Sequence, residues 1–361
     1  MSAAKKELVM MFTGGTDTTL AADRIAEAGE YDRLHLLTFC NGICVRVEHS
    51  RIHAEELVKK HGSDLISHEI IYVTELFKTI RSPLKPMIKE YDSTLTFDLC
   101  CRLSMESRAI MYALDHGLSE VCDGTNIDQG RLFLERPEYL RVSKAFFASF
   151  GIRYFSPVYA KEGGRMGRRD ELIRRGFTVG PRFFESLNIS TCLSTQPFCL
   201  MAFHTFFFTS FLRNAPLLRR FIAKHNLSLE RAIQLRLDRE TIARQAIEDH
   251  VAFNKVGQDG ESVRIQDHYC TTRLCGRNAV ELSFPKGTTL DVDALAAVWA
   301  EEPGFEKDGN IVRMRRGRME IEAFSTGRVL VHGAKDSEKA VGLFNELVAA
   351  PDVFSSPAES S

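Results

Sequence analysis

Apolar residues in the first 160 positions alternate between short continuous runs and longer stretches with helical spacing. The short runs predict buried strands at residues 8–12, 34–39, 66–73 and 120–123. The helical stretches cover residues 18–28, 46–61, 103–116 and 139–150. Strands separated by helices of this length favour right-handed crossovers and hence an α/β fold with a doubly wound parallel sheet, whose ligands bind at the carboxyl ends of the strands.

The pattern changes beyond this predicted α/β domain, which we assign to residues 1–160. Residues 161–256 begin with a basic, glycine-rich stretch and continue as a helical middle segment. Within it, residues 198–221 are rich in phenylalanine, which predicts a buried helix that forms core or a dimer surface. Residues 265–350 predict a small α+β domain with strands at 279–284, 311–314, 320–324 and 328–331 and a helix at 336–349. Residues 351–361 predict a disordered tail.

The composition excludes several classes of protein. The chain has 361 residues, of which 44% are hydrophobic and 26% charged, and its net charge is −1. These values exclude a wholly disordered chain and give no sign of a large nucleic-acid footprint. The N-terminus lacks the apolar core of a secretory signal, so we expect a cytoplasmic protein without membrane association. Its nine cysteines are then predicted to be reduced thiols, metal ligands or catalytic sulfur rather than disulfides.

The most specific motif is the glycine loop FTGGTDTT at residues 12–19, which follows a predicted strand and opens a predicted helix. Two consecutive glycines let backbone N–H groups approach a phosphate, and the helix N-terminus favours an anion. Further donors are the hydroxyls of Thr13, Thr16, Thr18 and Thr19. Asp17 could hold Mg²⁺ or cap the helix. A tight strand-to-helix turn with a Thr or Asp cap is the structural alternative.

The loop resembles the SGGxDS motif of the PP-loop ATP pyrophosphatases, with threonines replacing both serines and keeping their hydroxyls. Two further segments agree with this family. Residues 38–42 (TFCNG) lie where the family binds adenine and ribose, and residues 123–128 (DGTNID) are similar to its second phosphate-side loop. The resemblance covers roughly residues 7–160.

The resemblance implies an enzyme that binds ATP and Mg²⁺, adenylates a substrate oxygen with release of pyrophosphate, and lets a nucleophile displace AMP. It implies that pyrophosphate and Mg²⁺ contact Thr13, Gly14, Gly15, Thr16, Asp17 and Thr18. The adenosine is expected near Phe39 and Asn41, and the α-phosphate or ribose near Gly124 and Asn126. Asp17 is the expected catalytic residue of the loop.

Residues 98–117 place Cys101, Met105, Arg108 and Tyr112 on one helical face. We expect Cys101 in the first turn of this helix, where the helix dipole favours a thiolate. Arg108 is a candidate catalytic contact to a phosphate, with a surface ion pair as the alternative. The segment resembles a PP-loop subgroup whose helix starts Cys-x-x-Cys-Lys/Arg-Leu, although aspartate takes the place of the first cysteine here.

Thiolation enzymes of this superfamily commonly hold a [4Fe-4S] cluster with three cysteines, which implies the trio Cys101, Cys192 and Cys199 as candidate ligands. Cys101 and Cys199 are also candidate persulfide-carrying catalytic cysteines. Buried cysteines without any chemical role are the alternative for the trio. The other cysteines divide into two groups. We expect packing in the interior for Cys40, Cys44, Cys100 and Cys122, whereas an incomplete zinc half-site could be formed by Cys270 and Cys275.

Two further segments bear on partners. The basic residues of 161–175 could close over the polyphosphate or meet an acidic substrate, or could form a solvated helix face. Residues 275–295 and 327–348 resemble the C-terminal extension of adenylating enzymes that activate ubiquitin-like sulfur carriers, which implies a sulfur-carrier protein as a partner. An accessory domain that dimerises or packs on the ATP-binding domain is the alternative.

Taken together, these features predict a cytoplasmic, ATP-dependent sulfur transferase.

 The expected enzyme forms a homodimer, and its acceptor is a small metabolite or a tRNA base, with the near-neutral charge favouring the small molecule. Two alternatives stay open. One is a PP-loop ligase that forms amides or nitriles and needs no cysteine, and the other is a non-catalytic regulatory protein that binds ATP.

Overall fold

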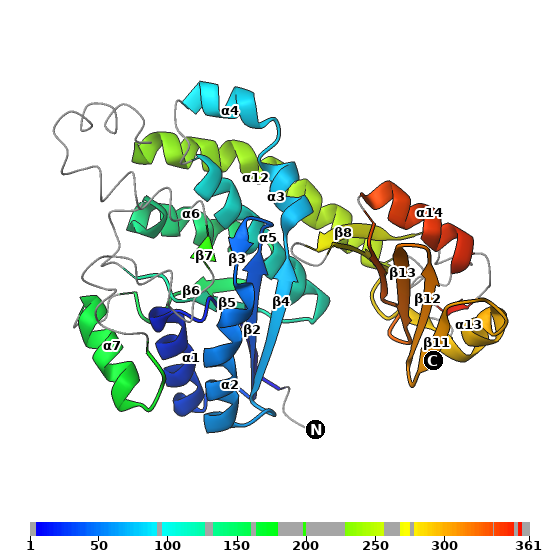
Figure 1. Ribbon diagram of the computed structural model, residues 1–361. Helices are drawn as coiled ribbons and strands as arrows, with labels where there is room; N and C mark the ends of the chain where they lie inside the picture. Colours follow the sequence, from blue (N-terminus) through cyan, green and yellow to red (C-terminus); the bar gives the residue numbers. More distant parts are fainter. Residues whose placement is uncertain are drawn as a thin grey trace. The chain divides into compact units, whose positions relative to one another are not determined.

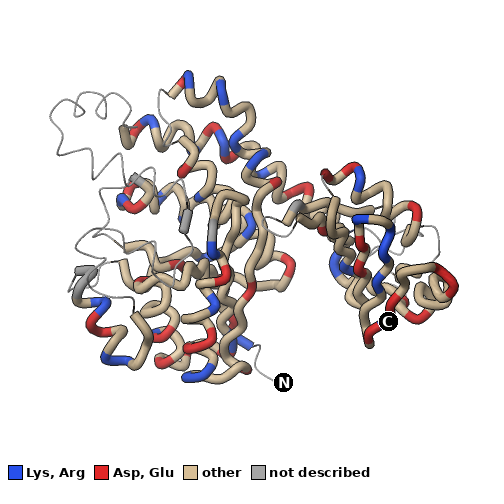
Figure 2. Tube along the Cα trace, in the orientation of Figure 1, with Lys and Arg blue, Asp and Glu red and all other residues tan. Residues whose placement is uncertain are grey.

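The computed structural model describes residues 5–91, 96–126, 133–159, 164–179, 198–199, 228–255, 268–274, 278–334, 336–349 and 353–355. The chain folds into two compact units, Met1–Ile247 and Glu248–Ser361 (Figure 1). The predicted middle segment, residues 161–256, therefore lies mostly in the first unit. Residues of both charge signs are interspersed along each unit (Figure 2), in keeping with the net charge of −1.

The first unit is built on a five-stranded sheet in the order β4-β2-β1-β5-β6, and each neighbouring pair is parallel. Its strands are β1 (Glu7–Met11), β2 (Arg33–Cys40), β4 (Ile66–Tyr72), β5 (Glu120–Asp123) and β6 (Arg153–Phe155). The predicted doubly wound parallel sheet is confirmed. Because the strand order turns back between β1 and β5, the topological switch point lies between their carboxyl ends.

Helices cover both faces of this sheet. The helices on one face are α1 (Thr16–Ala28), α2 (Ser50–His61) and α7 (Gly164–Arg174). The other face carries α3 (Thr74–Ile80), α4 (Leu84–Tyr91), α5 (Thr96–Asp115), α6 (Pro137–Ala148) and α12 (Leu229–Lys255). Along β1, Leu8 and Met10 join the core under α1, whereas Val9 and Met11 join the core under α5. Burial on both faces explains why β1 is a continuous apolar run.

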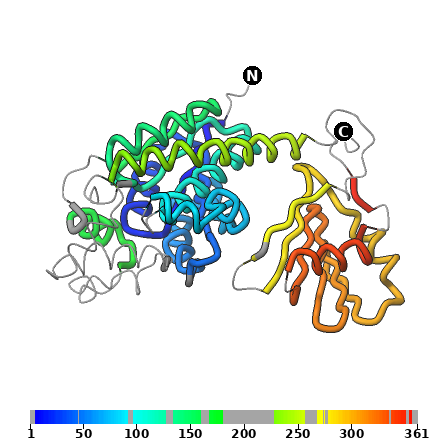
Figure 3. The backbone as a smooth tube through the Cα atoms, turned by 90° about the horizontal axis from the view of Figure 1, so that it is seen from above, coloured from blue at the N-terminus to red at the C-terminus, as the bar shows by residue number. Residues whose placement is uncertain are grey.

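A buried ion network fixes α5 against α12. The Arg236 Nη1 atom lies 2.6 Å from the Glu106 Oε2 atom, and both side chains are fully buried. The Arg102 Nε atom donates to Glu106 Oε1 at 2.8 Å. Burial opposes ionisation of Glu106, but the charges of these two arginines outweigh it and lower its pKa. Figure 3 shows α12 running alongside α6, where Arg236 Nη1 donates to the Tyr139 hydroxyl at 3.3 Å.

Several elements of the first unit differ from the prediction. Helix α5 begins at Thr96 rather than at residue 103, so Cys101 lies beyond the first turn and the helix dipole acts on it less than expected. Phe198–Cys199, in the segment predicted as a buried helix, form strand β7 and pair antiparallel with β3 (Cys44–Val45). Residues 200–221 lie outside the described residues. Of the described helices, none has the length and apolarity that crossing a bilayer requires.

The second unit confirms the predicted α+β domain. Its six-stranded sheet has the order β11-β12-β13-β14-β9-β8, with every neighbouring pair antiparallel. The strands are β8 (Cys270–Leu274), β9 (Ala279–Ser283), β11 (Phe305–Asp308), β12 (Ile311–Arg316), β13 (Met319–Phe324) and β14 (Val329–His332). Helices α13 (Val292–Trp299) and α14 (Ser337–Leu347) share its apolar core, and the Trp299 indole donates to the Leu347 carbonyl at 3.0 Å.

The predicted disordered tail contains an ordered strand. Phe354–Ser355 form β15, which pairs with β10 (Thr289–Leu290). The Phe354 side chain is buried, and its ring lies 4.7 Å from that of Phe284 between centroids. This part of the prediction was wrong because an apolar anchor within a Ser/Pro-rich segment was overlooked.

Candidate functional site

The glycine loop connects β1 to α1 at the switch point of the sheet, and its own side chains shape it. Gly14 has φ 68°, a left-handed conformation that favours glycine. The Gly15 N–H donates to the Thr13 hydroxyl at 3.2 Å, and the Thr18 hydroxyl donates to the Gly15 carbonyl at 3.2 Å. Gly15 is also the N-cap residue of α1. The threonine hydroxyls therefore support the loop conformation, and the start of α1 supplies backbone N–H groups for an anion.

The loop after β5 contacts the first turn of α1 directly. A Cβ atom on Gly124 would lie 2.6 Å from Thr18 Cγ2 and 2.7 Å from the Thr18 backbone nitrogen. Only glycine allows so close an approach between the two segments. Gly124, predicted from the family resemblance to lie near a nucleotide, thus has a packing role that joins the two loops; its contact with a nucleotide stays a prediction.

Asp17, in the first turn of α1, receives donors from two other segments. Its Oδ2 atom accepts a hydrogen bond from Asn126 Nδ2 at 2.9 Å, and its Oδ1 atom accepts one from Arg168 Nε at 2.5 Å. The Asp17 side chain is 16% exposed, whereas that of Arg168 is 2% exposed. Asp17 is therefore the point where the glycine loop, the loop after β5 and helix α7 meet.

Asn126 carries a buried acceptor that lacks a partner among the described residues. The residue is 1% exposed, and its Oδ1 atom receives no hydrogen bond there. A buried carbonyl oxygen in this position calls for a donor. A ribose hydroxyl or a metal-bound water can donate, whereas an ionised phosphate oxygen only accepts. Of the two contacts predicted for Asn126, its geometry favours the ribose over the α-phosphate.

Asp123, at the end of β5, is surrounded by donors. Its Oδ2 atom accepts hydrogen bonds from Arg102 Nη2 at 2.5 Å and from the Tyr154 hydroxyl at 2.7 Å. Its Oδ1 atom accepts them from the Ser156 hydroxyl at 2.5 Å and the Thr125 N–H at 3.1 Å. Although burial opposes ionisation, the charge of Arg102 and these donors lower the pKa of Asp123. This carboxylate anchors the loop that carries Gly124 and Asn126.

Asn41 joins two cysteines at the end of β2. Its Nδ2 atom donates to Cys101 Sγ at 2.8 Å, and its Oδ1 atom accepts from Cys44 Sγ at 3.2 Å. Cys44 is also the register partner of Cys199 in the β3–β7 pair. Cys44, predicted to pack, thus bonds to the same side chain as the predicted catalytic Cys101. The amide of Asn41 contacts these thiols, and its contact with adenosine, expected from the family resemblance, stays a prediction.

Two further predicted site residues have other contacts in the structure, and their predicted roles at a nucleotide stay predictions. Phe39 is 7% exposed and belongs to the apolar core under α5. Arg108 lies two helical turns beyond Cys101, about 10 Å along the axis, and its Nη1 atom is 3.9 Å from Met111 Sδ. The cation that α5 brings to the strand ends is Arg102, which sequence reasoning missed although it directly follows Cys101.

The remaining cysteines fall into separate environments. Burial raises the pKa of Cys100 to about 12, and burial raises that of Cys122 well above its ordinary value, as expected for packed thiols. Cys192 and Cys275 lie outside the described residues, and Cys199 is described only by its backbone. The described residues contain no group of three or more His, Cys, Asp or Glu that could hold a metal ion. The described side chains alone thus do not make up a [4Fe-4S] site.

Comparisons with known proteins complete this description. No protein-family model matches the chain, and no curated protein matches it. Among solved structures it is similar to a predicted subunit of tRNA methyltransferase from Methanocaldococcus jannaschii, with 21% identity and a TM-score of 0.31, over 46% of this chain and 73% of that one.

Two further structures are similar. One is a 4-thiouridine synthetase in complex with RNA and ATP, with 16% identity and a TM-score of 0.41, over 67% of this chain and 53% of that one. The other is the U34-tRNA thiolase NcsA from Methanococcus maripaludis with its [4Fe-4S] cluster, with 12% identity and a TM-score of 0.36, over 66% of this chain and 73% of that one. At these sequence identities and TM-scores, the function of the chain has to be argued from its own residues.

Proposed function

We propose that the chain is an ATP-dependent enzyme of the PP-loop type that adenylates an oxygen of its acceptor and then replaces this oxygen with sulfur. One observation carries the proposal. The glycine loop, Asp17 and the buried Asn126 converge at the switch point of a parallel sheet, where such folds bind ligands. The similarity of residues 12–19 to the SGGxDS motif supports ATP as the ligand.

The residues at the loop suit the parts of ATP and Mg²⁺. Backbone N–H groups at the start of α1 would receive the phosphates, since a helix N-terminus favours an anion. The buried Asn126 Oδ1 atom would accept a hydrogen bond from a ribose hydroxyl. The Asp17 carboxylate is the hard oxygen ligand at the loop that Mg²⁺ prefers.

The proposed reaction has two displacements. In the first, the acceptor oxygen forms a bond to the α-phosphorus, the bond to the bridging oxygen breaks, and pyrophosphate leaves with the electron pair. In the second, a sulfur nucleophile bonds to the acceptor carbon, and AMP leaves with the acceptor oxygen. The protein contributes position and charge at the phosphates rather than covalent chemistry in the first displacement.

On the sulfur side we propose that Cys101 carries the transferred sulfur as a persulfide, which it receives from an external persulfide donor whose own thiol leaves. The terminal sulfur of this persulfide is the nucleophile of the second displacement, and external thiols, oxidised to a disulfide, then cleave the S–S bond to release the thiolated acceptor and restore the Cys101 thiol. The thiols of Cys101 and Cys44 both bond to the side chain of Asn41, and this places them near the end of β2. The predicted ligand set Cys101, Cys192 and Cys199 for a [4Fe-4S] cluster stays a proposal. Anaerobic purification followed by iron and sulfide analysis tests it, and an iron-free protein would contradict it.

The role of Cys44 can be tested apart from the cluster. We expect Cys44→Ser to lower sulfur transfer at least tenfold while leaving adenylation, measured as pyrophosphate exchange into ATP, intact, because Cys44 lies at the sulfur side of the proposed site. Cys40→Ser is the matched control, since Cys40 is 1% exposed on β2 and is predicted only to pack. Equal sulfur transfer by the Cys44 variant and the wild type would remove Cys44 from the proposed mechanism.

The test of the proposed function is the formation of AMP and pyrophosphate from ATP with Mg²⁺. It is measured with a small-metabolite pool, with unfractionated tRNA and with no acceptor. We expect Asp17→Asn to lower AMP formation by about 100-fold or more, the usual effect of removing one group that stabilises developing charge. Asp64→Asn, at an exposed position, is the control and should match the wild type.

The same assay separates the alternatives. An amide or nitrile product that still forms after replacement of both Cys44 and Cys101 would favour an amide- or nitrile-forming ligase. Nucleotide binding without any AMP would favour a regulatory protein. Dependence of AMP formation on tRNA or on a metabolite would identify the acceptor class.

A further inference from the structure

We infer that Arg168 on α7 binds the terminal phosphates of the nucleotide, an inference that rests on the proposed ATP site. The basic stretch at residues 161–175 divides into two groups of arginines with different surroundings. Arg168 and Arg169 are 2% and 7% exposed. Arg174 is exposed, and Arg175 lies in an ion network with α1 and α2.

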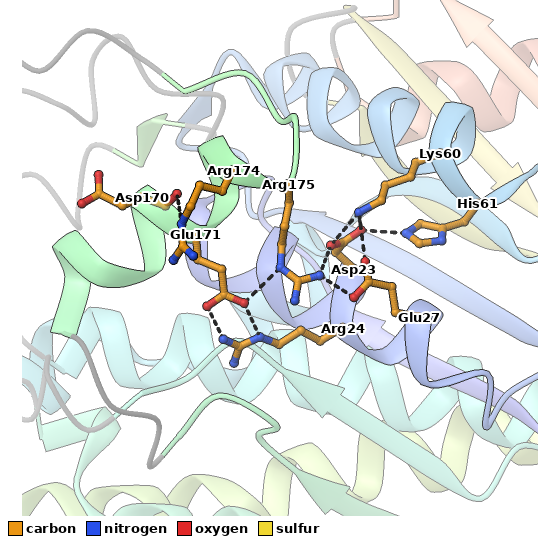
Figure 4. Close-up of polar contacts among 9 residues, drawn as sticks. All are labelled: Asp23, Arg24, Glu27, Lys60, His61, Asp170, Glu171, Arg174 and Arg175. Atoms are coloured by element: carbon orange, nitrogen blue, oxygen red, sulfur yellow. Dashed lines mark hydrogen bonds and ion pairs between the residues drawn. The ribbon is translucent and has the colours of Figure 1, made fainter.

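The ion network docks α7 on α1 and α2 (Figure 4). The fully buried Asp23 carboxylate accepts hydrogen bonds from Arg175 Nη1 at 2.8 Å and from Lys60 Nζ at 2.8 Å. Burial opposes ionisation of Asp23, but hydrogen bonds from its basic partners outweigh it and lower its pKa. Arg24 Nε donates to Glu171 Oε1 at 3.0 Å and so adds a second tie. These contacts fix the C-terminal half of α7.

The segment after α7 is tied to the glycine loop itself. The ring of His53, on α2, is 1% exposed and lies between two carbonyl oxygens. Its Nδ1 atom is 2.7 Å from the Gly14 carbonyl, and its Nε2 atom is 2.6 Å from the Thr178 carbonyl. The Glu56 carboxylate accepts a hydrogen bond from the Thr178 N–H at 3.2 Å. Helix α7 is therefore held in a fixed relation to the loop.

Against this background the position of Arg168 needs its own explanation. Docking of α7 is already provided by Arg175, Glu171 and Thr178, whereas Arg168 reaches the first turn of α1 and bonds to Asp17. A guanidinium that is 2% exposed costs free energy to remove from water. A cation placed next to the N-terminus of a helix also works against the helix dipole. Both costs would be offset by an anion at the loop.

The chemistry of that anion follows from the geometry. The planar guanidinium can bind phosphate oxygens with several N–H donors while Nε remains on Asp17. ATP and inorganic pyrophosphate both offer adjacent phosphates with high charge. AMP has only the α-phosphate and should not reach Arg168 if Asn126 holds the ribose. If Arg168 has this role, its replacement should weaken binding of ligands that carry the terminal phosphates and should not change binding of AMP.

The experiment is isothermal titration calorimetry of ATP, pyrophosphate and AMP with the full chain. We expect Arg168→Gln to weaken binding of ATP and pyrophosphate by about 10- to 100-fold, the loss typical of a charge-assisted hydrogen bond, and to leave AMP binding unchanged. Arg168→Lys keeps the charge without the planar donors and should give an intermediate loss. Arg174→Gln is the matched control on the exposed side of the same helix and should bind all three ligands like the wild type.

The outcomes separate the inference from the proposed function. If the wild type binds ATP and both Arg168 variants bind ATP with the affinity of the wild type, the inference is overturned and the ATP site stands. An equal loss of AMP and ATP binding in a folded Arg168→Lys variant would also overturn it, because it would indicate a general distortion. If the wild type binds neither ATP nor pyrophosphate, the proposed function itself fails.

Discussion

Asp17 lies in the first turn of α1 and Asp123 at the end of β5, and each pairs with an arginine at 2.5 Å, yet their surroundings differ. The Asp123 side chain is 4% exposed, and hydroxyl donors from Tyr154 and Ser156 complete its contacts. The Asp17 side chain is 16% exposed and bonds to Asn126, whose own buried oxygen has no partner among the described residues.

These two pairs show how a structural ion pair differs from an ion pair at a binding site. The same two residue types make both pairs, so residue type alone does not distinguish them. Asp123 holds together segments of one folded unit, and its oxygens are filled by protein donors. Around Asp17 the donors come from a loop and from α7, and an acceptor stays available for a ligand. We therefore propose a structural role for Asp123 and nucleotide binding for Asp17.

The largest expected effect comes from breaking the structural pair. We expect Asp123→Asn to lower the free energy of unfolding by about 3–5 kcal/mol, because it removes one of the two carboxylates that neutralise Arg102 in a buried site. Urea unfolding followed by circular dichroism measures this loss. Asp17→Asn should lose less, about 1–3 kcal/mol, because water reaches the 16% exposed Asp17 side chain although its partner Arg168 is buried. Equal losses in the two variants would contradict the assignment.

A smaller effect is expected where the two loops touch. In Gly124→Ala the added methyl group would meet the backbone of Thr18, so the loop after β5 has to shift away from α1. We expect ATP binding to weaken about tenfold and stability to fall by about 1–3 kcal/mol, the usual cost of overpacking. Gly342→Ala on α14, where the new methyl group meets nothing within 4 Å, is the control and should stabilise the chain slightly. Unchanged ATP affinity in Gly124→Ala would show that the close contact between the two loops does not contribute to ATP binding.

The smallest expected effect is a pH dependence of the free energy of unfolding that comes from His68 on β4. Burial, assisted by the charge of Arg51, lowers the pKa of His68 to about 4. Between the ordinary value near 6.5 and about 4, the unfolded chain binds more protons at this residue than the folded chain. The free energy of unfolding should therefore fall as the pH is lowered through this window, by at most about 1.4 kcal/mol per pH unit.

The variant His68→Gln isolates this contribution. Urea unfolding at several pH values between 4 and 7 should show a shallower slope for the variant than for the wild type. If the free energy of unfolding changes with pH by the same slope in the variant and the wild type, His68 does not cause the pH dependence. Because His68 contacts Thr38 on the neighbouring strand, this titration reports on the sheet and not on Asp17.

Much of the architecture could be predicted from local patterns. The glycine loop lies between β1 and α1 as expected, since its neighbours form an apolar strand and an amphipathic helix. The start of α5 was misplaced because residues 96–102 lack a helical apolar stripe of their own and are buried through tertiary packing. Local patterns also failed to indicate the short strand at Phe354, which depends on a partner strand some 60 residues earlier in the chain.

The site was predictable only where its residues adjoin one another in sequence. Residues 13–18 were expected at the loop and lie there. Arg168 reaches Asp17 across 151 positions, and Asn41 reaches Cys101 across 60. A single sequence gives no distances of this kind. The signals that could have helped were weak: Arg102 directly follows Cys101, and Cys44 lies three residues after Asn41.

The central claim is that the chain cleaves ATP between the α- and β-phosphates at the Asp17 loop. Exchange of radiolabelled pyrophosphate into ATP, with Mg²⁺ and acceptor present, measures this step directly, because label enters ATP only if adenylation is reversible on the enzyme. We predict exchange by the wild type and by Asp64→Asn, and its loss in Asp17→Asn. ADP as the nucleotide product, or exchange that persists in Asp17→Asn, would contradict the account.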